Sequence, residues 1–212
     1  MGPDACPRCG EPGPRASVGG RCAACMGKEI VWAGARAAFR HQGVARRLVA
    51  ELKFGGQPVL GRLMATLAQS AFADLACCAE GPERSVVTWV PCHRRNQRER
   101  GYNQAEVLAR WLTTGAGLSA RAALVCKTKS TKRQKALGRE GRQENLKGAF
   151  SLEPGALARL PSRTSALILV DDVLTTGATA REVSKVLKED TGLPVYVFTF
   201  SRAVGGTPER HD

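Results

Sequence analysis

The sequence predicts an α/β domain with a largely parallel sheet, preceded by a small metal-binding knuckle. Two observations predict the domain. Apolar, β-branched runs alternate with segments of helical periodicity, and the apolar run 166–170 leads through a small-residue turn into a helix. Two CxxC pairs within the first 25 residues predict the knuckle. The 212 residues, of which 43% are hydrophobic, suffice for one compact core and an appendage. We therefore expect the knuckle at 1–30 and the α/β domain at 31–212.

The knuckle contains four cysteines with the spacing of a zinc site, Cys6-x2-Cys9 and Cys22-x2-Cys25. Each pair can place two thiolates on one turn, and two such turns form a tetrahedral sulfur site for structural zinc. The residues between the pairs are rich in glycine and cannot form an apolar core, so a metal is needed to order them. Disulfides and redox chemistry are the alternatives. The lack of an export signal disfavours disulfides, and a redox motif needs no second pair.

Helices and a strand alternate in the first half of the domain. Apolar spacing predicts one helix over 33–54, interrupted at a glycine, and a second over 60–79, which follows a Gly-Gly and proline break. Residues 85–90 are apolar and β-branched, which predicts a strand. Proline ends this strand, and an arginine-rich loop should follow. The next helix is predicted to run to about residue 113, with Asn103 as its cap.

The second half is predicted to hold the strands that complete the sheet. Its basic segment shows no clear periodicity, whereas its apolar runs are short and bounded by turn residues. The elements expected are a short strand at 122–126, a basic excursion at 127–147, a loop at 154–165, a buried strand at 166–170, a helix at 178–189 and a strand at 194–200.

Single cysteines and aromatic residues in these elements are assigned to packing. The cysteines without ligand spacing are expected to be small buried side chains, and the tryptophans are expected to lie in the core or between domains. These residues are Cys77, Cys78, Cys92, Cys126, Trp32, Trp89 and Trp111. His93 lies beside the arginine cluster, where it is a candidate catalytic group or a structural loop histidine.

Positive charge is concentrated in one segment. Residues 91–147 carry 14 Lys and Arg against 4 Glu, which is +10 of the formal charge of +13. A solubilising surface is one interpretation. The crowding of Arg94, Arg95, Arg98 and Arg100 into seven positions favours phosphate recognition, because the arginine fork matches phosphate oxygens.

The stretch 167–179 predicts a phosphate site. Its buried strand delivers Asp171 and Asp172 at the carboxyl end, where α/β sheets bind ligands. Gly177 permits close approach of the backbone, and the following helix directs amides at a phosphate. Hydroxyl donors are added by Thr175, Thr176 and Thr179. Because the two carboxylates can hold sugar hydroxyls or Mg²⁺, the arrangement predicts a ribose 5-phosphate site. A capped helix after an acidic turn is the alternative, and the sequence contains no Walker A loop.

These thirteen residues resemble the phosphoribosyl-pyrophosphate (PRPP) motif of type I phosphoribosyltransferases. Three further segments resemble the competence protein F family, as does the cysteine knuckle, and together the similarity covers about residues 6–203. The segments are Leu52-Lys53-Phe54-Gly55-Gly56, the arginine-rich 90–104, and 127–150 with its Asn145-Leu146-x-Gly148-Ala149-Phe150 end. The sequence departs from the family pattern at Cys92, Tyr102 and His41, none of which belongs to the phosphate motif.

The resemblance implies roles for particular residues. Asp171 and Asp172 would hold the ribose hydroxyls, and residues 175–179, including Ala178, would hold the 5′-phosphate. Arg98, Arg100 and Lys53 would contact the pyrophosphate, with Mg²⁺ bridging pyrophosphate and ribose oxygens. Asp171, Asp172, Arg98 and Arg100 would form the catalytic group. The segment 127–150 would form a basic hood over the site.

Two functions are compatible with these features. By resemblance, the protein would act in natural transformation, bind PRPP or a ribose 5-phosphate ligand, and handle single-stranded DNA with a competence ATPase or helicase. The residues expected to bind nucleic acid are Arg94, Arg95, Lys129, Lys132, Arg133 and Lys135. The alternative is a PRPP-dependent transferase with an unidentified acceptor and no DNA role. No apolar run approaches the roughly 20 residues of a membrane span and no signal peptide is seen, so we expect a cytoplasmic location.

Overall fold

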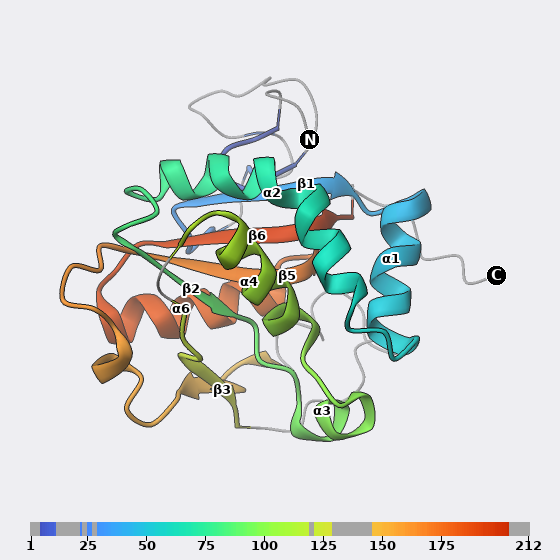
Figure 1. The fold of residues 1–212 in the computed structure, drawn as a ribbon. Coiled ribbons are helices and arrows are strands. Elements are labelled where there is room, and N and C mark those ends of the chain that lie inside the picture. Colours follow the sequence, from blue (N-terminus) through green and yellow to red (C-terminus); the bar gives the residue numbers. More distant parts are fainter. Residues whose placement is uncertain are drawn as a thin grey trace.

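A computed structural model describes residues 5–11, 22, 25–26, 29–118, 121–128 and 146–203. Its centre is a four-stranded parallel sheet in the order β1-β6-β5-β2. The strands are β1 (Gly34–Arg40), β6 (Val195–Arg202), β5 (Ala166–Leu174) and β2 (Ser85–Trp89). Figure 1 shows them side by side, with their carboxyl ends pointing toward α1 (Gly43–Phe54). The fold is the predicted α/β class.

Layers of helices and a small sheet cover the two faces. One face packs against α1, α2 (Leu60–Cys78) and α4 (Gln104–Gly115), and the other packs against α6 (Ala178–Thr191). The second face also receives a two-stranded antiparallel sheet of β3 (Val125–Lys127) and β4 (Phe150–Leu152). A short helix, α3 (Arg94–Arg100), lies beyond the carboxyl ends of the strands (Figure 1), and the 3-10 helix η2 (Leu157–Arg159) follows β4.

The strand β5 contributes to both hydrophobic cores. Ile168 and Val170 belong to the core that α1, α2 and α4 cover, whereas Leu167 and Leu169 belong to the core under α6. Successive side chains of a strand point to opposite faces. Because both faces are covered, the strand has an unbroken apolar sequence, which is typical of a buried parallel strand.

Most predicted elements are confirmed. The structure has α2, β2, α4, α6 and β6 close to the expected residues. Asn103 caps α4 as predicted, because its Oδ1 accepts a hydrogen bond from the amide of Ala105 at 3.0 Å. Within the described residues, no helix combines the length and apolar character that crossing a membrane requires.

The prediction of one helix over 33–54 is wrong. Residues Gly34–Arg40 form β1, and only Gly43–Phe54 is helical. Alanine favours helix locally and β1 contains no β-branched residue. Pairing along the whole edge of β6 and burial of Ala35 and Ala37 outweigh that preference.

Three smaller expectations also change. The expected arginine-rich loop is the helix α3, which His93 caps by accepting a hydrogen bond from the amide of Arg95. The strand predicted to end at Val170 continues to Leu174, because β6 pairs with it that far. Of the four cysteines expected to be buried, Cys77 and Cys78 are exposed at the end of α2, and the other two are half-buried.

Candidate functional site

The candidate site lies where β5 ends and α6 begins. Asp171 and Asp172 lie within the last residues of β5, and Asp172 is buried. The chain then turns through the exposed Thr175 and Thr176 to Gly177, which has φ +79° and precedes the first residue of α6. Only glycine adopts this backbone conformation readily, so the sequence permits an abrupt entry into the helix. The oxygen of the Thr176 side chain accepts a weak hydrogen bond from the amide of Ala178 at 3.4 Å.

A lysine from another motif reaches the acidic pair. The Nζ of Lys53, in the last turn of α1, lies 3.0 Å from Oδ1 of Asp172, and the two side chains are 29% and 9% exposed. Burial acts to lower the pKa of Lys53, but the attraction of Asp172 and Asp171 outweighs burial and raises it. Lys53 is therefore a charged ammonium group within the site. The sequence predicted both residues, and the structure brings them together.

Arg100 belongs to the same neighbourhood. Its guanidinium lies over the ring of Phe54 at 5.1 Å, and its charge acts against protonation of Lys53. The hydroxyl of Tyr102 donates to the carbonyl oxygen of Leu52 at 2.6 Å. These contacts fasten the segment after α3 to the end of α1, so the two motifs that supply Lys53 and Arg100 form one unit.

Cys92 lies near Arg100 and Lys127, and the sequence assigned neither Cys92 nor Lys127 a role in the site. Burial lowers the pKa of Lys127 and raises that of Cys92. The charges of Arg100 and Lys127 both oppose the rise at Cys92, which shows that these basic groups approach the same loop. The ammonium of Lys127 also lies 5.6 Å from the ring centre of Phe150. The sequence could not identify Lys127, because no local pattern distinguishes it from the other basic residues of its segment.

Among the described residues, no hydrogen bond or ion pair joins Arg95, Arg98 or Thr179 to the acidic pair. Arg98 is exposed on α3, and Arg95 forms a surface ion pair with Glu99 at 2.8 Å. Thr179 is half-buried in the first turn of α6. Most of the hood segment lies outside the described residues. The same is true of four residues predicted to bind nucleic acid, which are Lys129, Lys132, Arg133 and Lys135. Arg94 begins α3.

The acidic pair makes stability depend on pH. Burial and the charge of Asp172 raise the pKa of Asp171 from 3.8 to about 7. Between pH 3.8 and about pH 7, the folded chain keeps a proton on Asp171 that the unfolded chain has lost. The free energy of unfolding therefore falls as the pH rises through this range. Asp171→Asn removes this titration. The free energy of unfolding of Asp171→Asn minus that of wild type should be larger at pH 8 than at pH 5. The expected increase is about 2–3 kcal/mol, at 1.36 kcal/mol per pKa unit.

Urea unfolding at the two pH values measures this difference. Asp190→Asn is the matched control, because Asp190 is exposed near the end of α6. Its effect on stability should be nearly the same at both pH values. An Asp171→Asn variant whose stability runs parallel to that of wild type across this range would contradict the buried, proton-holding carboxyl.

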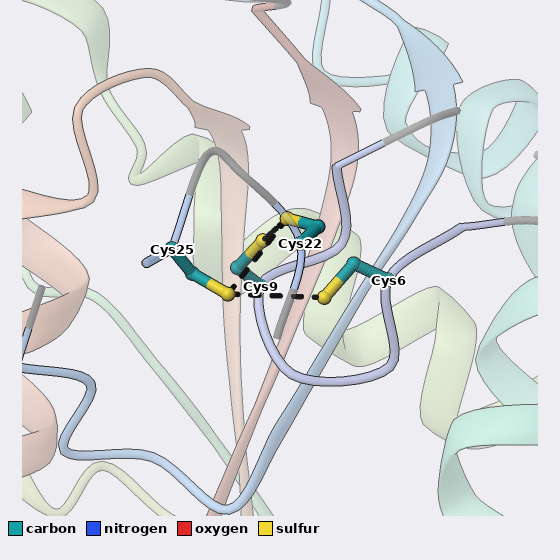
Figure 2. Close-up of side chains that lie close together, drawn as sticks. All are labelled: Cys6, Cys9, Cys22 and Cys25. Carbon is teal, nitrogen blue, oxygen red and sulfur yellow. Dashed lines mark hydrogen bonds between the residues drawn. The ribbon is translucent and has the colours of Figure 1, made fainter. Parts of the chain in front are cut away.

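The four knuckle cysteines converge as predicted. All four Sγ atoms lie within 4.8 Å of one another, and Figure 2 shows them pointing toward a common centre. The separations are 4.0 Å for Cys6 to Cys25, 3.4 Å for Cys9 to Cys22 and 3.7 Å for Cys22 to Cys25. Tetrahedral zinc with Zn–S bonds of about 2.3 Å places sulfurs about 3.8 Å apart. The residues therefore fit a structural Zn²⁺, and their chemistry suits no hard cation such as Mg²⁺.

The described knuckle residues pack along the free edge of β1, on the side away from β6 (Figure 1). The amide of Ala35 donates to the carbonyl oxygen of Pro7 at 3.0 Å. Glu11 forms a largely buried ion pair with Arg202, the last residue of β6, at 2.6 Å. The knuckle thus supplies hydrogen-bond partners to an edge that would otherwise be open to another strand.

The parallel sheet, its flanking helices and the N-terminal cysteine cluster define a type I phosphoribosyltransferase-like fold with a cysteine knuckle. None of the protein-family models compared with the chain matches it. The chain is 32% identical to competence protein F of Haemophilus influenzae over 156 residues, which are 74% of this chain and 67% of that protein. The chain belongs to the competence protein F family.

Two further relatives match over a longer range. The DNA utilization protein YhgH of Salmonella typhimurium is 28% identical over 201 residues, and that of Escherichia coli is 29% identical over 203. Each alignment covers 94% of this chain and 84% of the relative. The similarity therefore extends over both the cysteine knuckle and the α/β domain.

Proposed function

We propose that the protein acts in DNA uptake as a PRPP-binding or ribose 5-phosphate-binding protein that also binds single-stranded DNA. The observation that carries the ligand site is the contact of Lys53 with Asp172 beside the Gly177 turn. It joins two motifs more than a hundred residues apart in the sequence. The names of the relatives, competence protein F and DNA utilization protein, support the DNA role.

The groups around the acidic pair suit the parts of PRPP. The turn 175–177 and the first amides of α6 would bind the 5′-phosphate, since a helix N-terminus attracts anions. Asp171 and Asp172 would accept hydrogen bonds from the ribose hydroxyls. Lys53 and Arg100 would neutralise the pyrophosphate, and Arg98 would complete the catalytic group if transfer occurs. Mg²⁺ would supply further positive charge to the pyrophosphate.

We extend the proposal to the chain's organisation and partners. Residues 1–30 would form the zinc knuckle, 31–212 the phosphoribosyltransferase-like domain, and 127–150 its basic hood. A competence ATPase or helicase would be the protein partner. A transferase without a DNA role is the second candidate, and the grouping of Lys53, Asp172 and the Gly177 turn at one edge of the sheet favours it. Release of pyrophosphate with an acceptor would distinguish it from simple binding.

Calorimetric titration of the full chain with PRPP and Mg²⁺ tests the ligand site. We expect saturable binding that ribose 5-phosphate competes for. Asp172→Asn should weaken binding about 10- to 100-fold, because losing a charge-assisted hydrogen bond costs about 1.5–3 kcal/mol. Asp190→Asn is the control and should bind as wild type does. Absence of both heat and thermal stabilisation at millimolar PRPP would refute the ligand site.

Single-stranded DNA should bind through the basic segment with little sequence preference. Phosphate contacts release counterions, so log affinity should fall with log salt by about 0.7 per phosphate contacted. Replacing Lys129, Lys132, Arg133 and Lys135 with alanine should lower affinity for all sequences alike and flatten this dependence. Fluorescence anisotropy at a series of salt concentrations measures both effects.

The control is a second fourfold variant with the same loss of charge elsewhere. Its alanines replace residues that are exposed outside the basic segment: Arg47, Arg62, Arg163 and Lys188. Its salt dependence should remain that of wild type. If the two variants weaken DNA binding equally, net charge rather than the basic segment governs binding, and this part of the proposal fails.

A further inference from the structure

Trp32 connects the cysteine knuckle to the turn that precedes α6. Its indole Nε1 donates a hydrogen bond to the carbonyl oxygen of Arg8 at 2.7 Å. Arg8 lies between Cys6 and Cys9, inside the first CxxC turn. The other end of the same indole reaches Gly177, where an added Cβ would stand 3.1 Å from Cη2. One side chain thus touches both the cysteine cluster and the phosphate turn.

The indole has little freedom to move. Trp32 is 7% exposed and belongs to the core that also contains Leu174 and Ala178, the residues on either side of the turn. A buried indole N–H needs an acceptor, and the acceptor here is the knuckle carbonyl of Arg8. The position of the ring under Gly177 therefore depends on where the Cys6–Cys9 turn holds Arg8.

Metal binding would fix that turn. Cys6 and Cys9 are both buried and their Sγ atoms belong to the fourfold cluster. Short segments of this kind have almost no core of their own and are ordered by the metal they bind. With the metal removed, the Arg8 carbonyl is held only through the contacts of its neighbours, such as that of Pro7 with β1, and the acceptor of the ring becomes less firmly fixed.

We propose that Trp32 is a positioning residue through which the metal state of the knuckle sets the order of the phosphate turn 175–177. The inference rests on the proposed function for the ligand it would affect. The coupling itself joins two parts of the chain that lie more than 140 residues apart in sequence. Trp32 touches no ligand group; it acts on the turn through Gly177.

Amide hydrogen exchange on the full-length protein tests the coupling without any ligand. Removing zinc from wild type with a chelator should speed exchange at residues 181–183 about tenfold, as the loss of one hydrogen bond predicts; the amide of Arg181, the first of these, donates to the carbonyl oxygen of Gly177 in the turn at 2.8 Å. Trp32→Phe keeps an aromatic ring but lacks the N–H donor. Its zinc-loaded form should exchange at these residues as fast as zinc-free wild type, and chelation should add little.

Trp111→Phe is the control, because Trp111 packs against the other core. It should leave the turn protected and its zinc sensitivity intact. A Trp32→Phe variant that keeps one zinc per chain and exchanges at 181–183 as wild type does would overturn the proposal. So would a turn that stays protected in zinc-free wild type. A purely structural role for Trp32 would loosen the turn but leave its response to chelation unchanged, which also counts against the coupling.

The ligand assay is read separately. If the coupling and the ligand site are both correct, zinc-free wild type and Trp32→Phe should bind PRPP about tenfold more weakly than zinc-loaded wild type, in line with the loss of turn order. If zinc-loaded wild type binds no PRPP while the exchange results are as expected, the proposed ligand is wrong and the coupling stands. If PRPP binds and exchange at the turn ignores the metal, the coupling is wrong and the ligand stands.

Discussion

Gly177→Val is expected to abolish PRPP binding, whereas Gly192→Val should leave binding intact. Both glycines have positive φ, +79° and +70°, at the two ends of α6. Valine at either position costs about 1–2 kcal/mol for the left-handed backbone. Only at Gly177 does an added Cβ meet a buried ring, since nothing lies within 4 Å of the same atom at Gly192. The difference between the two variants therefore isolates the turn from general strain.

The contact with Trp32 gives the physical reason for this expectation. A side chain at Gly177 would point at Trp32. It would therefore displace the turn by contact with the buried indole, and it need not contact the phosphate directly. Calorimetry with PRPP and Mg²⁺ gives the affinities, and thermal unfolding shows how much stability each variant loses. Equal loss of affinity in the two valine variants would mean that lowered stability, and not the turn, accounts for the defect.

Changing Cys22 and Cys25 together to serine should reduce zinc from about one per chain to none. Two neutral hydroxyls are poor substitutes for thiolates at a zinc site. Structural zinc in small knuckles contributes about 10–16 kcal/mol of apparent binding free energy, so this is the largest energetic change among the variants considered. The knuckle should lose its order, while the α/β domain should keep its secondary structure because it has its own two cores.

Elemental analysis and circular dichroism measure these two outcomes. The control replaces Cys77 and Cys78 with serine, which removes two cysteines that are exposed at the end of α2. That variant should keep its zinc. Full zinc content in the Cys22 and Cys25 variant would show that the metal is held elsewhere in the chain.

The stretch from β5 to α6 was predicted as a buried strand, a turn and a helix, although β5 continues past Val170 to Leu174. Burial on both faces leaves an unbroken apolar run, and the glycine turn marks the start of the helix, so local sequence carries the structure. The strand β1 could not be predicted in this way. Its alanines have no local preference for a strand, and its conformation follows from pairing with β6, which lies more than 150 residues later.

The same contrast holds at the candidate site. The sequence nominated Lys53, Asp171 and Asp172 because their motifs are recognisable, but the 3.0 Å contact between Lys53 and Asp172 is a product of the fold. Trp32 was correctly expected to pack in the interior or between domains. Its hydrogen bond to the knuckle could not be foreseen, because no pattern within one segment reports which distant carbonyl an indole will reach.

The strand order also constrains how the protein is made. The strand β6 lies between β1 and β5, yet it is synthesised after both. During translation, β1 has no strand to pair with until residues 195–202 of β6 have left the ribosome. Pairing between strands so far apart in sequence is slow. Until then the edges of β1 and β5 that pair with β6 lack their partner, which favours contact with chaperones or other chains. A chain interrupted before residue 195 would lack an interior strand of the sheet, so premature termination should leave a product that cannot fold.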